Sequence, residues 1–360
     1  MTTATTVDPV QSEAFAERML TIMNDASLAL MISIGHRTGL FDALDGLPSA
    51  TSAALAERAG CDERYVREWL GAMTTGRLVT YDAAADTYHL PPEHAAWLTR
   101  RATPNNMGVF SQYIAVLGGV EDDIVECFRN GGGVPYSKFP RFHAVMAEDS
   151  GQTVLGALEE HILPLIEGIE DQLESGIDVL DVGCGSGRAM NLLATRYPRS
   201  RFVGYDISED AIAVARNEAA SFGLTNVFFE VVDATRIEDV ARYDLITTFD
   251  AVHDQADPAA VLAGIRQALK PTGTYLMQDI CASSHLEKNM AHPIAPFLYT
   301  ISTMHCMTVS LAADGAGLGT CWGEETALEM LDTAGFPTVE VKRLPHDIQN
   351  NFYIAQPARS

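Results

Sequence analysis

The chain has 360 residues, of which 47% are hydrophobic, and a formal net charge of −24 at pH 7. This length and apolar content predict a globular protein of two or three domains and exclude a disordered chain. A surface this acidic repels phosphate backbones and anionic membranes. We therefore expect a neutral or cationic small molecule as partner, with no nucleic acid and no membrane.

The six cysteines are scattered along the chain and form no C-x-x-C pair. This spacing argues against a zinc module or a disulfide scaffold and fits a reducing cytosol. The first nine residues lack the basic and apolar pattern of a signal peptide, and the longest apolar stretch, near residues 28–34, is far too short for a membrane span. We therefore expect a cytoplasmic protein, and no motif with metal-ligand spacing is present.

Residues 12–35 predict one helix, because apolar side chains recur there at helical spacing. Toward its end, at residues 28–34, the helix carries more apolar side chains than one buried face needs. This surplus predicts a second buried face, and we expect a homodimer formed through the N-terminal domain.

Residues 51–78 predict two helices in close succession. Thr51 or Ser52 caps the first helix, Gly60 ends it, and Asp62 caps the second. A hairpin built from residues 78–80 and 87–90 should follow.

The order of these elements resembles a winged helix. From residue 51 to residue 99 the chain has four arginines, no lysine and seven acidic residues. A DNA-reading domain needs a basic footprint, which this segment lacks. We therefore interpret residues 1–100 as a packing or dimerisation domain, as in dimeric small-molecule O-methyltransferases.

Residues 101–170 predict a mostly helical linker that is broken by Gly131–Gly133 and Pro135. An aromatic set follows the break, at Tyr136, Phe139, Phe142 and His143.

Strands and helices alternate from Gly176 to the C-terminus, which predicts an α/β domain over residues 171–360. We expect a doubly wound sheet of seven mostly parallel strands, at residues 177–182, 201–205, 227–232, 243–249, 273–279, 337–343 and 351–356. The last two strands are joined by a short connection and should pair antiparallel.

The first of these strands runs into a glycine-rich turn, D-V-L-D-V-G-C-G-S-G, which is followed at once by a helical pattern. Glycines stand at Gly183, Gly185 and Gly187, around Cys184. A dinucleotide-binding turn, G-x-G-x-x-G, has its third glycine three residues after the second, which is position 188 here, and this chain has an arginine there. The pattern D-x-G-x-G-x-G, which begins at Asp181, instead resembles motif I of the class I S-adenosylmethionine (SAM) methyltransferases.

This resemblance implies that the glycines admit the methionine end of SAM and that Asp181 holds the turn and the ammonium group. The second strand ends at Asp206, followed by Ile207, and a carboxylate there can accept hydrogen bonds from both ribose hydroxyls. Taken alone, this acid fits NAD equally well. By resemblance, Asp233, which precedes Ala234, receives the adenine amino group; a simple helix N-cap is the alternative.

The fourth strand ends in D-A-V-H-D-Q-A-D-P, from Asp250 to Pro258. This segment resembles the H-D-x-x-D block of plant-type and antibiotic-pathway O-methyltransferases. The resemblance implies that His253 is the general base for a hydroxyl nucleophile, that Asp250 lies at the cofactor, and that Asp254 or Asp257 orients the ring. A histidine that caps the next helix or contacts SAM is the alternative.

The chain departs from the plant pattern, because Gln255 stands where those enzymes have tryptophan. The substrate and the type of nucleophile can therefore differ. N-, S- or C-methylation, or a non-methylating reaction on the same fold, remain open, as does a SAM-sensing winged-helix regulator.

A long insert follows the fifth strand, from Cys281 to Gly323, and an insert of this size is usually functional. In the resembled families the linker and this insert contact the substrate, which adds four residues to the aromatic set: His292, Tyr299, His305 and Trp322. Packing on the N-terminal domain is the alternative. Together the motifs predict a SAM-dependent methyltransferase that acts on a small, fairly apolar molecule and releases S-adenosylhomocysteine.

Overall fold

The computed structural model describes residues 7–103, 106–345 and 347–358. The chain divides into two compact units, Met1–Gly118 and Gly119–Ser360. No helix in the described part of the chain is both long and apolar enough to cross a lipid bilayer.

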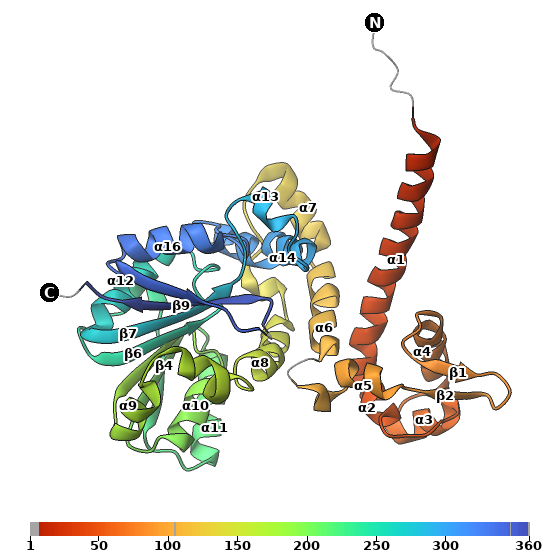
Figure 1. Cartoon of the computed structure of the whole chain (residues 1–360), viewed down its shortest axis with the longest axis horizontal. Helices are drawn as coiled ribbons and strands as arrows, with labels where there is room; N and C mark the ends of the chain where they lie inside the picture. Colours follow the sequence, from red (N-terminus) through yellow and green to blue (C-terminus); the bar gives the residue numbers. More distant parts are fainter. Residues whose placement is uncertain (1–6, 104–105, 346, 359–360) are drawn as a thin grey trace, which may run out of the picture. The chain divides into compact units, whose positions relative to one another are not determined.

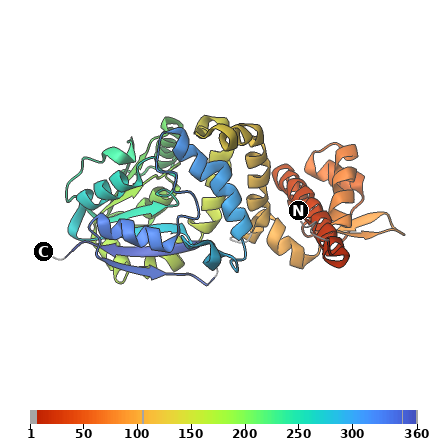
Figure 2. The same cartoon turned by 90° about the horizontal axis from the view of Figure 1, so that it is seen from above.

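The first unit is mainly helical. It contains α1 (Pro9–Thr38), α2 (Leu40–Leu44), α3 (Ser52–Ala59), α4 (Glu63–Thr75), β1 (Thr80–Asp82), β2 (Thr87–His89), α5 (Pro92–Leu98), the short helix η1 (Arg100–Ala102) and α6 (Met107–Gly118). The two strands pair antiparallel and form the wing of a winged helix. Figures 1 and 2 show α1 and α6 packed side by side.

The predicted caps of the two short helices are confirmed. Thr51 accepts a hydrogen bond from the N–H of Ala54, and Asp62 accepts one from the N–H of Arg64. Gly60 ends α3 with a φ of 65°, a conformation that glycine adopts without steric cost. The strands of the hairpin lie at 80–82 and 87–89, so the first begins two residues later than predicted.

Helix α1 spans 30 residues and extends beyond both ends of the predicted helix. Its apolar surplus is divided between two environments. Leu28, Met31 and Ile32 pack against the core of the winged helix, whereas Leu30 and Ile34 stay exposed. The indole N–H of Trp69 on α4 donates to the carbonyl of Met31, which fixes this end of α1 on the domain.

The second unit begins with helices that precede the sheet. These are α7 (Glu121–Asn130), η2 (Tyr136–Lys138), α8 (Phe142–Thr153), η3 (Leu158–Ile162), η4 (Leu163–Leu165) and α9 (Ile169–Ser175). The predicted helical linker is therefore divided between the two units at Gly118, and our boundaries at 100 and 170 stay a prediction.

Seven strands form one sheet in the order β5-β4-β3-β6-β7-β9-β8. Their bounds are β3 (Asp178–Val182), β4 (Arg201–Asp206), β5 (Val227–Val231), β6 (Tyr243–Phe249), β7 (Leu269–Ile280), β8 (Thr338–Lys342) and β9 (Asn350–Gln356). The first five strands are parallel, and β9 runs antiparallel to both β7 and β8. The predicted α/β fold and its closing hairpin are confirmed.

Helices cover both faces of the sheet (Figures 1 and 2). One core is built with α9, α10 (Arg188–Arg196) and α11 (Glu209–Ser221), and the other with α12 (Pro258–Ala268) and α16 (Gly323–Thr333). Successive strand residues alternate between the two cores, as Val179 and Leu180 do on β3. This arrangement directs the carboxyl ends of the parallel strands to one edge, where ligands bind in open α/β sheets.

The long insert is helical and consists of α13 (Leu286–Asn289), α14 (Ala295–Ile301), the π-helix η6 (Ser302–Cys306) and α15 (Met307–Ala312). The short helix η5 (Ala234–Arg236) follows β5.

Candidate active site

The glycine-rich turn after β3 has three residues with positive φ, 76° at Gly183, 52° at Gly185 and 69° at Gly187. A Cβ atom at Gly183 would lie 2.6 Å from the Cβ of Ala251, and one at Gly187 would lie 2.3 Å from the ring of Phe229. A Cβ at Gly185 would meet no atom within 4 Å. Packing therefore requires the outer two glycines, while the middle one faces open space where a ligand can approach the backbone.

Asp206 holds the same turn from the neighbouring strand β4. Its Oδ2 accepts the N–H of Gly185 at 2.8 Å, and its Oδ1 accepts the N–H of Ser208 at 2.8 Å. A carboxylate has lone pairs beyond these two bonds, so Asp206 can also accept hydroxyl groups of a ligand. The next residue, Ile207, is exposed and offers an apolar surface at the edge of the turn.

Asp181 lies beneath the turn and is buried. The hydroxyl of Thr247 donates to it at 2.7 Å. Burial raises the pKa of Asp181 to about 7, and the hydrogen bond from Thr247 opposes this rise. These contacts indicate that Asp181 supports the turn, whereas its contact to the SAM ammonium group stays a prediction.

Asp233 is the N-cap of η5, which is the alternative role that the sequence allowed. Its Oδ1 accepts both the N–H and the hydroxyl of Thr235, and these two bonds hold the pKa of Asp233 below its usual range. Among the residues that the structure describes, its Oδ2 approaches Arg236 alone, at 3.7 Å, so an acceptor remains beside Ala234 for a ligand amino group.

Asp250 ends β6 with a φ of 52°, in the left-handed region that non-glycine residues seldom adopt. Gln278 on β7 donates to its Oδ2 at 3.1 Å, and its buried Oδ1 has no hydrogen-bond partner among the described residues. Burial raises the pKa of Asp250 well above the ordinary value, followed in size by the effect of the Asp279 carboxylate. A strained, unsatisfied carboxyl group at this strand end is typical of a ligand site.

His253 lies in the loop after β6 and is 4% exposed. Its Nδ1 lies 2.9 Å from Oδ1 of Asp279, a fully buried residue on β7. The indole N–H of Trp322 donates to the same carboxylate oxygen at 2.9 Å. Asp279 thereby fixes the proton on Nδ1 and leaves Nε2 as the acceptor of the ring.

Burial by itself would lower the pKa of His253, but the Asp279 carboxylate and the Cys306 thiol beside the ring raise it well above the ordinary value. The pair is therefore a histidine and a carboxylate that strengthens it as a base.

The acid that contacts His253 is not one of the two that the sequence suggested. Asp254 accepts a long hydrogen bond from its neighbour Gln255, at 3.4 Å, and Asp257 caps α12 through the N–H of Ala260. Asp254 is partly buried; burial raises its pKa to about 6, and the nearby charge of His253 opposes this rise. Asp279 was missed because it belongs to a different strand; the acid at the carboxyl end of β7 was the available signal.

The predicted aromatic set converges on His305. The ring of Phe142 stacks on His305 at 3.4 Å between centroids, and the rings of Tyr136 and Phe139 meet it edge-on at 5.1 and 4.9 Å. Burial raises the pKa of Tyr136, and the carboxylates of Asp254 and Asp206 raise it further. The linker and the insert therefore meet beside the residues that hold the glycine turn and His253.

The structure shows local contacts for the other predicted substrate residues. His292 accepts the N–H of Ile294 at 3.4 Å, and Tyr299 accepts the side-chain amide of Asn289 at 2.9 Å, both within the insert. Trp322 is buried and donates to Asp279, so it helps to hold that carboxylate in place. The substrate contacts of all three residues stay a prediction.

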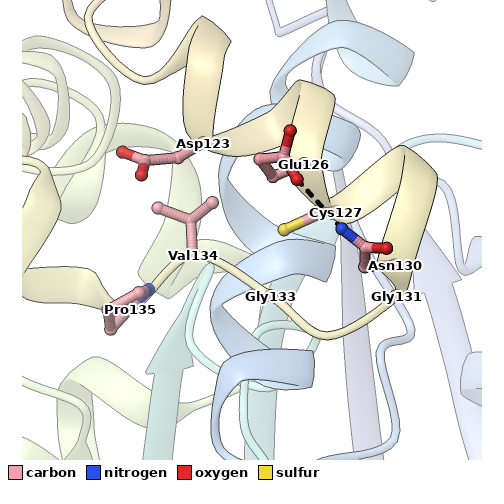
Figure 3. A pocket seen from close by; sticks show the side chains of 8 residues that line it. All are labelled: Asp123, Glu126, Cys127, Asn130, Gly131, Gly133, Val134 and Pro135. Atoms are coloured by element: carbon pink, nitrogen blue, oxygen red, sulfur yellow. Dashed lines mark hydrogen bonds between the residues drawn. The ribbon is translucent and has the colours of Figure 1, made fainter.

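A shallow pocket lies between the end of α7 and the loop 131–135 (Figure 3), and none of the predicted site residues lines it. Among the described residues, no three histidine, cysteine, aspartate or glutamate side chains gather as metal ligands.

Two protein-family models match the chain. Residues 26–100 match the Rv2258c-like winged HTH domain, and residues 173–334 match a methyltransferase domain. Among curated proteins, the ubiquinone biosynthesis O-methyltransferase of Leptothrix cholodnii is 34% identical over 107 residues, which are 29% of this chain and 45% of that protein. The match thus spans less than half of that relative.

Two solved structures resemble nearly the whole chain. One is a protein from Nostoc punctiforme named a putative O-methyltransferase. It superposes with a TM-score of 0.72 at 19% identity, and the match covers 98% of this chain and 100% of that one. Human N-acetylserotonin methyltransferase in complex with SAM superposes with a TM-score of 0.67 at 16% identity and covers 99% of this chain and 100% of that one. At such identities the likeness establishes a shared fold. The chain therefore combines an Rv2258c-like winged helix-turn-helix domain with a methyltransferase domain of the class I fold.

Proposed function

We propose that this protein is a SAM-dependent methyltransferase that acts on an oxygen of a small, fairly apolar molecule, with His253 as the general base. The observation that carries the proposal is the buried hydrogen bond between His253 and Asp279 at the carboxyl ends of β6 and β7. The glycine turn that would hold the cofactor lies at the end of the adjacent strand β3.

The residues of the turn fit SAM. Gly185 faces open space, Asp206 retains acceptor capacity for ribose hydroxyls, and the unsatisfied Oδ1 of Asp250 suits a cationic ligand. When bound, SAM supplies a methyl group on a sulfonium leaving group, which departs neutral and needs no acid. The protein's part is to align the nucleophile and to exclude water.

A hydroxyl group also has to lose its proton, because the neutral oxygen is a poor nucleophile. The Nδ1 proton of His253 is held by Asp279, so Nε2 accepts the proton of the substrate hydroxyl. The Asp279 carboxylate then stabilises the imidazolium ion that forms. Trp322 keeps that carboxylate in place, since it donates to the oxygen that bonds His253.

The proposal is tested by incubating the purified protein with methyl-labelled SAM and a panel of hydroxylated aromatic compounds. We expect label in a product that has gained one methyl group, together with S-adenosylhomocysteine. Methylation at nitrogen, sulfur or carbon would replace the O-methyl assignment. A product without the methyl group would indicate a non-methylating enzyme on this fold.

The winged helix supports a second candidate, a SAM-sensing regulator that binds DNA. Helix α4, which would be the DNA-recognition helix of a winged helix, carries two arginines and two glutamates, and each arginine forms an ion pair with one of those glutamates. This side of the domain therefore offers no free basic footprint, and we propose that it serves packing instead of DNA binding. Tight, salt-dependent and sequence-specific DNA binding in a gel-shift assay would reverse this assignment.

We further propose that the protein is a cytoplasmic homodimer assembled through α1. All six cysteines are thiols in the structure, which fits a reducing compartment. Helix α1 exposes a series of large apolar side chains, including Phe15, Leu20 and Met23, and Leu20 is 67% exposed. Exposed apolar surface of this extent on one helix is typical of a protein interface.

A further inference from the structure

His305 brings a polar imidazole ring into contact with the rings of Tyr136, Phe139 and Phe142. It is 1% exposed, and neither of its ring nitrogens has a hydrogen-bond partner among the residues that the structure describes. A buried polar group that is left unsatisfied destabilises a protein, so His305 needs a partner from outside the chain, such as a ligand or a water molecule.

The local backbone places His305 and Cys306 together at the site. Both belong to η6, a π-helix of five residues that separates α14 from α15. Short π-helical turns are frequent at functional sites. The Cys306 thiol lies beside the ring of His253, so the preceding residue brings a second imidazole to the same region.

The two imidazoles have opposite environments. Burial, together with the smaller effects of the charges on His253 and His143, lowers the pKa of His305 to about 3. His305 is therefore neutral wherever the protein is folded and active, with one ring nitrogen as donor and the other as acceptor. It cannot take the proton of the substrate, whereas His253 can.

The side chains that contact His305 are aromatic rings. Phe142 lies parallel to His305 at an interplanar angle of 6°, while Tyr136 and Phe139 stand at 82° and 75° to it. Flat rings that are arranged in this way favour contact with a planar aromatic molecule.

We infer that His305 is a specificity-determining residue that hydrogen-bonds a second oxygen of a planar aromatic substrate, next to the oxygen that His253 deprotonates. This inference rests on the proposed methyltransferase function and names the class of its substrate. A ring with a single oxygen would leave both nitrogens of His305 unsatisfied and would bind more weakly.

Binding of two small probes tests the inference without turnover. Catechol carries two neighbouring hydroxyl groups, and phenol carries one. With S-adenosylhomocysteine present, which has no methyl group to transfer, an NMR titration should show that the wild-type protein binds catechol at least about tenfold more tightly than phenol, the effect of about one hydrogen bond. Equal affinities would overturn the inference.

Two variants assign the preference to His305. His305→Phe keeps a flat ring but removes both nitrogens, so it should bind catechol and phenol equally. His305→Gln keeps a donor and an acceptor and should retain part of the preference. A preference that persists unchanged in His305→Phe would also overturn the inference.

Controls separate this inference from the proposed function and from misfolding. His305→Phe should bind SAM as the wild type does and should melt at the same or a higher temperature, because it removes unsatisfied polar atoms. The matched variant His285→Phe, at an exposed position of the insert, should leave the preference intact. Failure of the wild type to bind SAM would refute the proposed function, whereas SAM binding without a preference for catechol refutes only the role of His305.

Discussion

Asp279 bonds both the ring of His253 and the indole of Trp322 through a single carboxylate oxygen, each at 2.9 Å, and the same oxygen accepts the backbone N–H of Ile280 at 2.8 Å. Its other oxygen is buried and has no hydrogen-bond partner among the described residues. His253, Asp279 and Trp322 come from the loop after β6, from β7 and from the end of the insert. Their contact joins three separate parts of the chain around one buried carboxylate.

Removal of His253 tests the base directly. His253→Ala should reduce kcat at least about 100-fold while the affinity for SAM stays unchanged, because the ring acts on the substrate proton. Single-turnover kinetics and calorimetric titration with SAM measure the two quantities. The control His285→Ala, at an exposed histidine, should behave as the wild type. An undiminished kcat in His253→Ala would remove the base but leave the fold assignment intact.

The pH dependence of activity reports the coupling between His253 and Asp279. The carboxylate raises the pKa of His253, and only the neutral ring accepts a proton, so kcat/KM should fall as the pH decreases through that raised pKa. Asp279→Asn removes the charge, so the acidic limb should move to lower pH. The rate should also fall at least about 100-fold, because the amide no longer fixes the ring tautomer.

A change at Trp322 serves as the matched control for that profile. Trp322→Phe removes one donor to the carboxylate but keeps its charge, which makes Asp279 a stronger partner for the imidazolium ion. The acidic limb should therefore move slightly to higher pH, with a smaller loss of rate. A limb that does not move in Asp279→Asn would contradict the assignment of this pair as the base.

Asp206 is expected to control cofactor affinity. Asp206→Asn loses the charge that strengthens hydrogen bonds from ribose hydroxyls and keeps only one acceptor oxygen, so the Kd for SAM should rise about 10-fold or more. Calorimetric titration checks this value. Asp210→Asn, an exposed position on the following helix, should leave the Kd unchanged. If both variants bound SAM equally well, the ribose role of Asp206 would be wrong.

Substitutions of two glycines in the turn should distinguish an effect on protein stability from an effect on SAM binding. Gly187→Ala places a Cβ against the ring of Phe229 and should lower the free energy of unfolding by about 2–4 kcal/mol, from overpacking together with positive φ. Gly185→Ala meets open space and should cost only about 1–2 kcal/mol. Chemical denaturation measures both changes.

The two glycine variants should rank the other way in SAM affinity, with the larger loss in Gly185→Ala. The new methyl group at position 185 projects into the space proposed for the ligand, so Gly185→Ala should weaken SAM binding strongly although it destabilises the fold less than Gly187→Ala does. Normal SAM affinity in Gly185→Ala would show that the cofactor does not approach this part of the turn.

The proposed dimer depends on the exposed apolar side chains of α1. The double substitution of Leu20→Glu and Met23→Glu should raise the dimer dissociation constant by more than about tenfold, because charges then enter an apolar interface. Light scattering coupled to size-exclusion chromatography gives the mass. Arg18→Glu adds acidic charge at a polar position of the same helix and serves as the control. A monomeric wild-type protein would refute the dimer.

Local sequence determined the scaffold of this protein. The alternation of strands and helices, the three spaced glycines and the acids at strand ends are short-range patterns, and they predicted the seven-stranded sheet, its closing hairpin and the turn after β3. Helix caps at Thr51 and Asp62 were equally readable, because a cap bonds only its own first turn.

Only the tertiary structure decided which acid serves His253 and what surrounds His305. Asp279 is 26 residues from His253 along the chain, and Trp322 is 43 residues from Asp279, so no local pattern pairs them. Asp254 stood next to His253 in sequence, yet adjacent side chains in a loop need not face each other. The neutrality of His305 likewise follows from its burial against the rings of the distant segment 136–142, because a pKa depends on surroundings that only folding brings together.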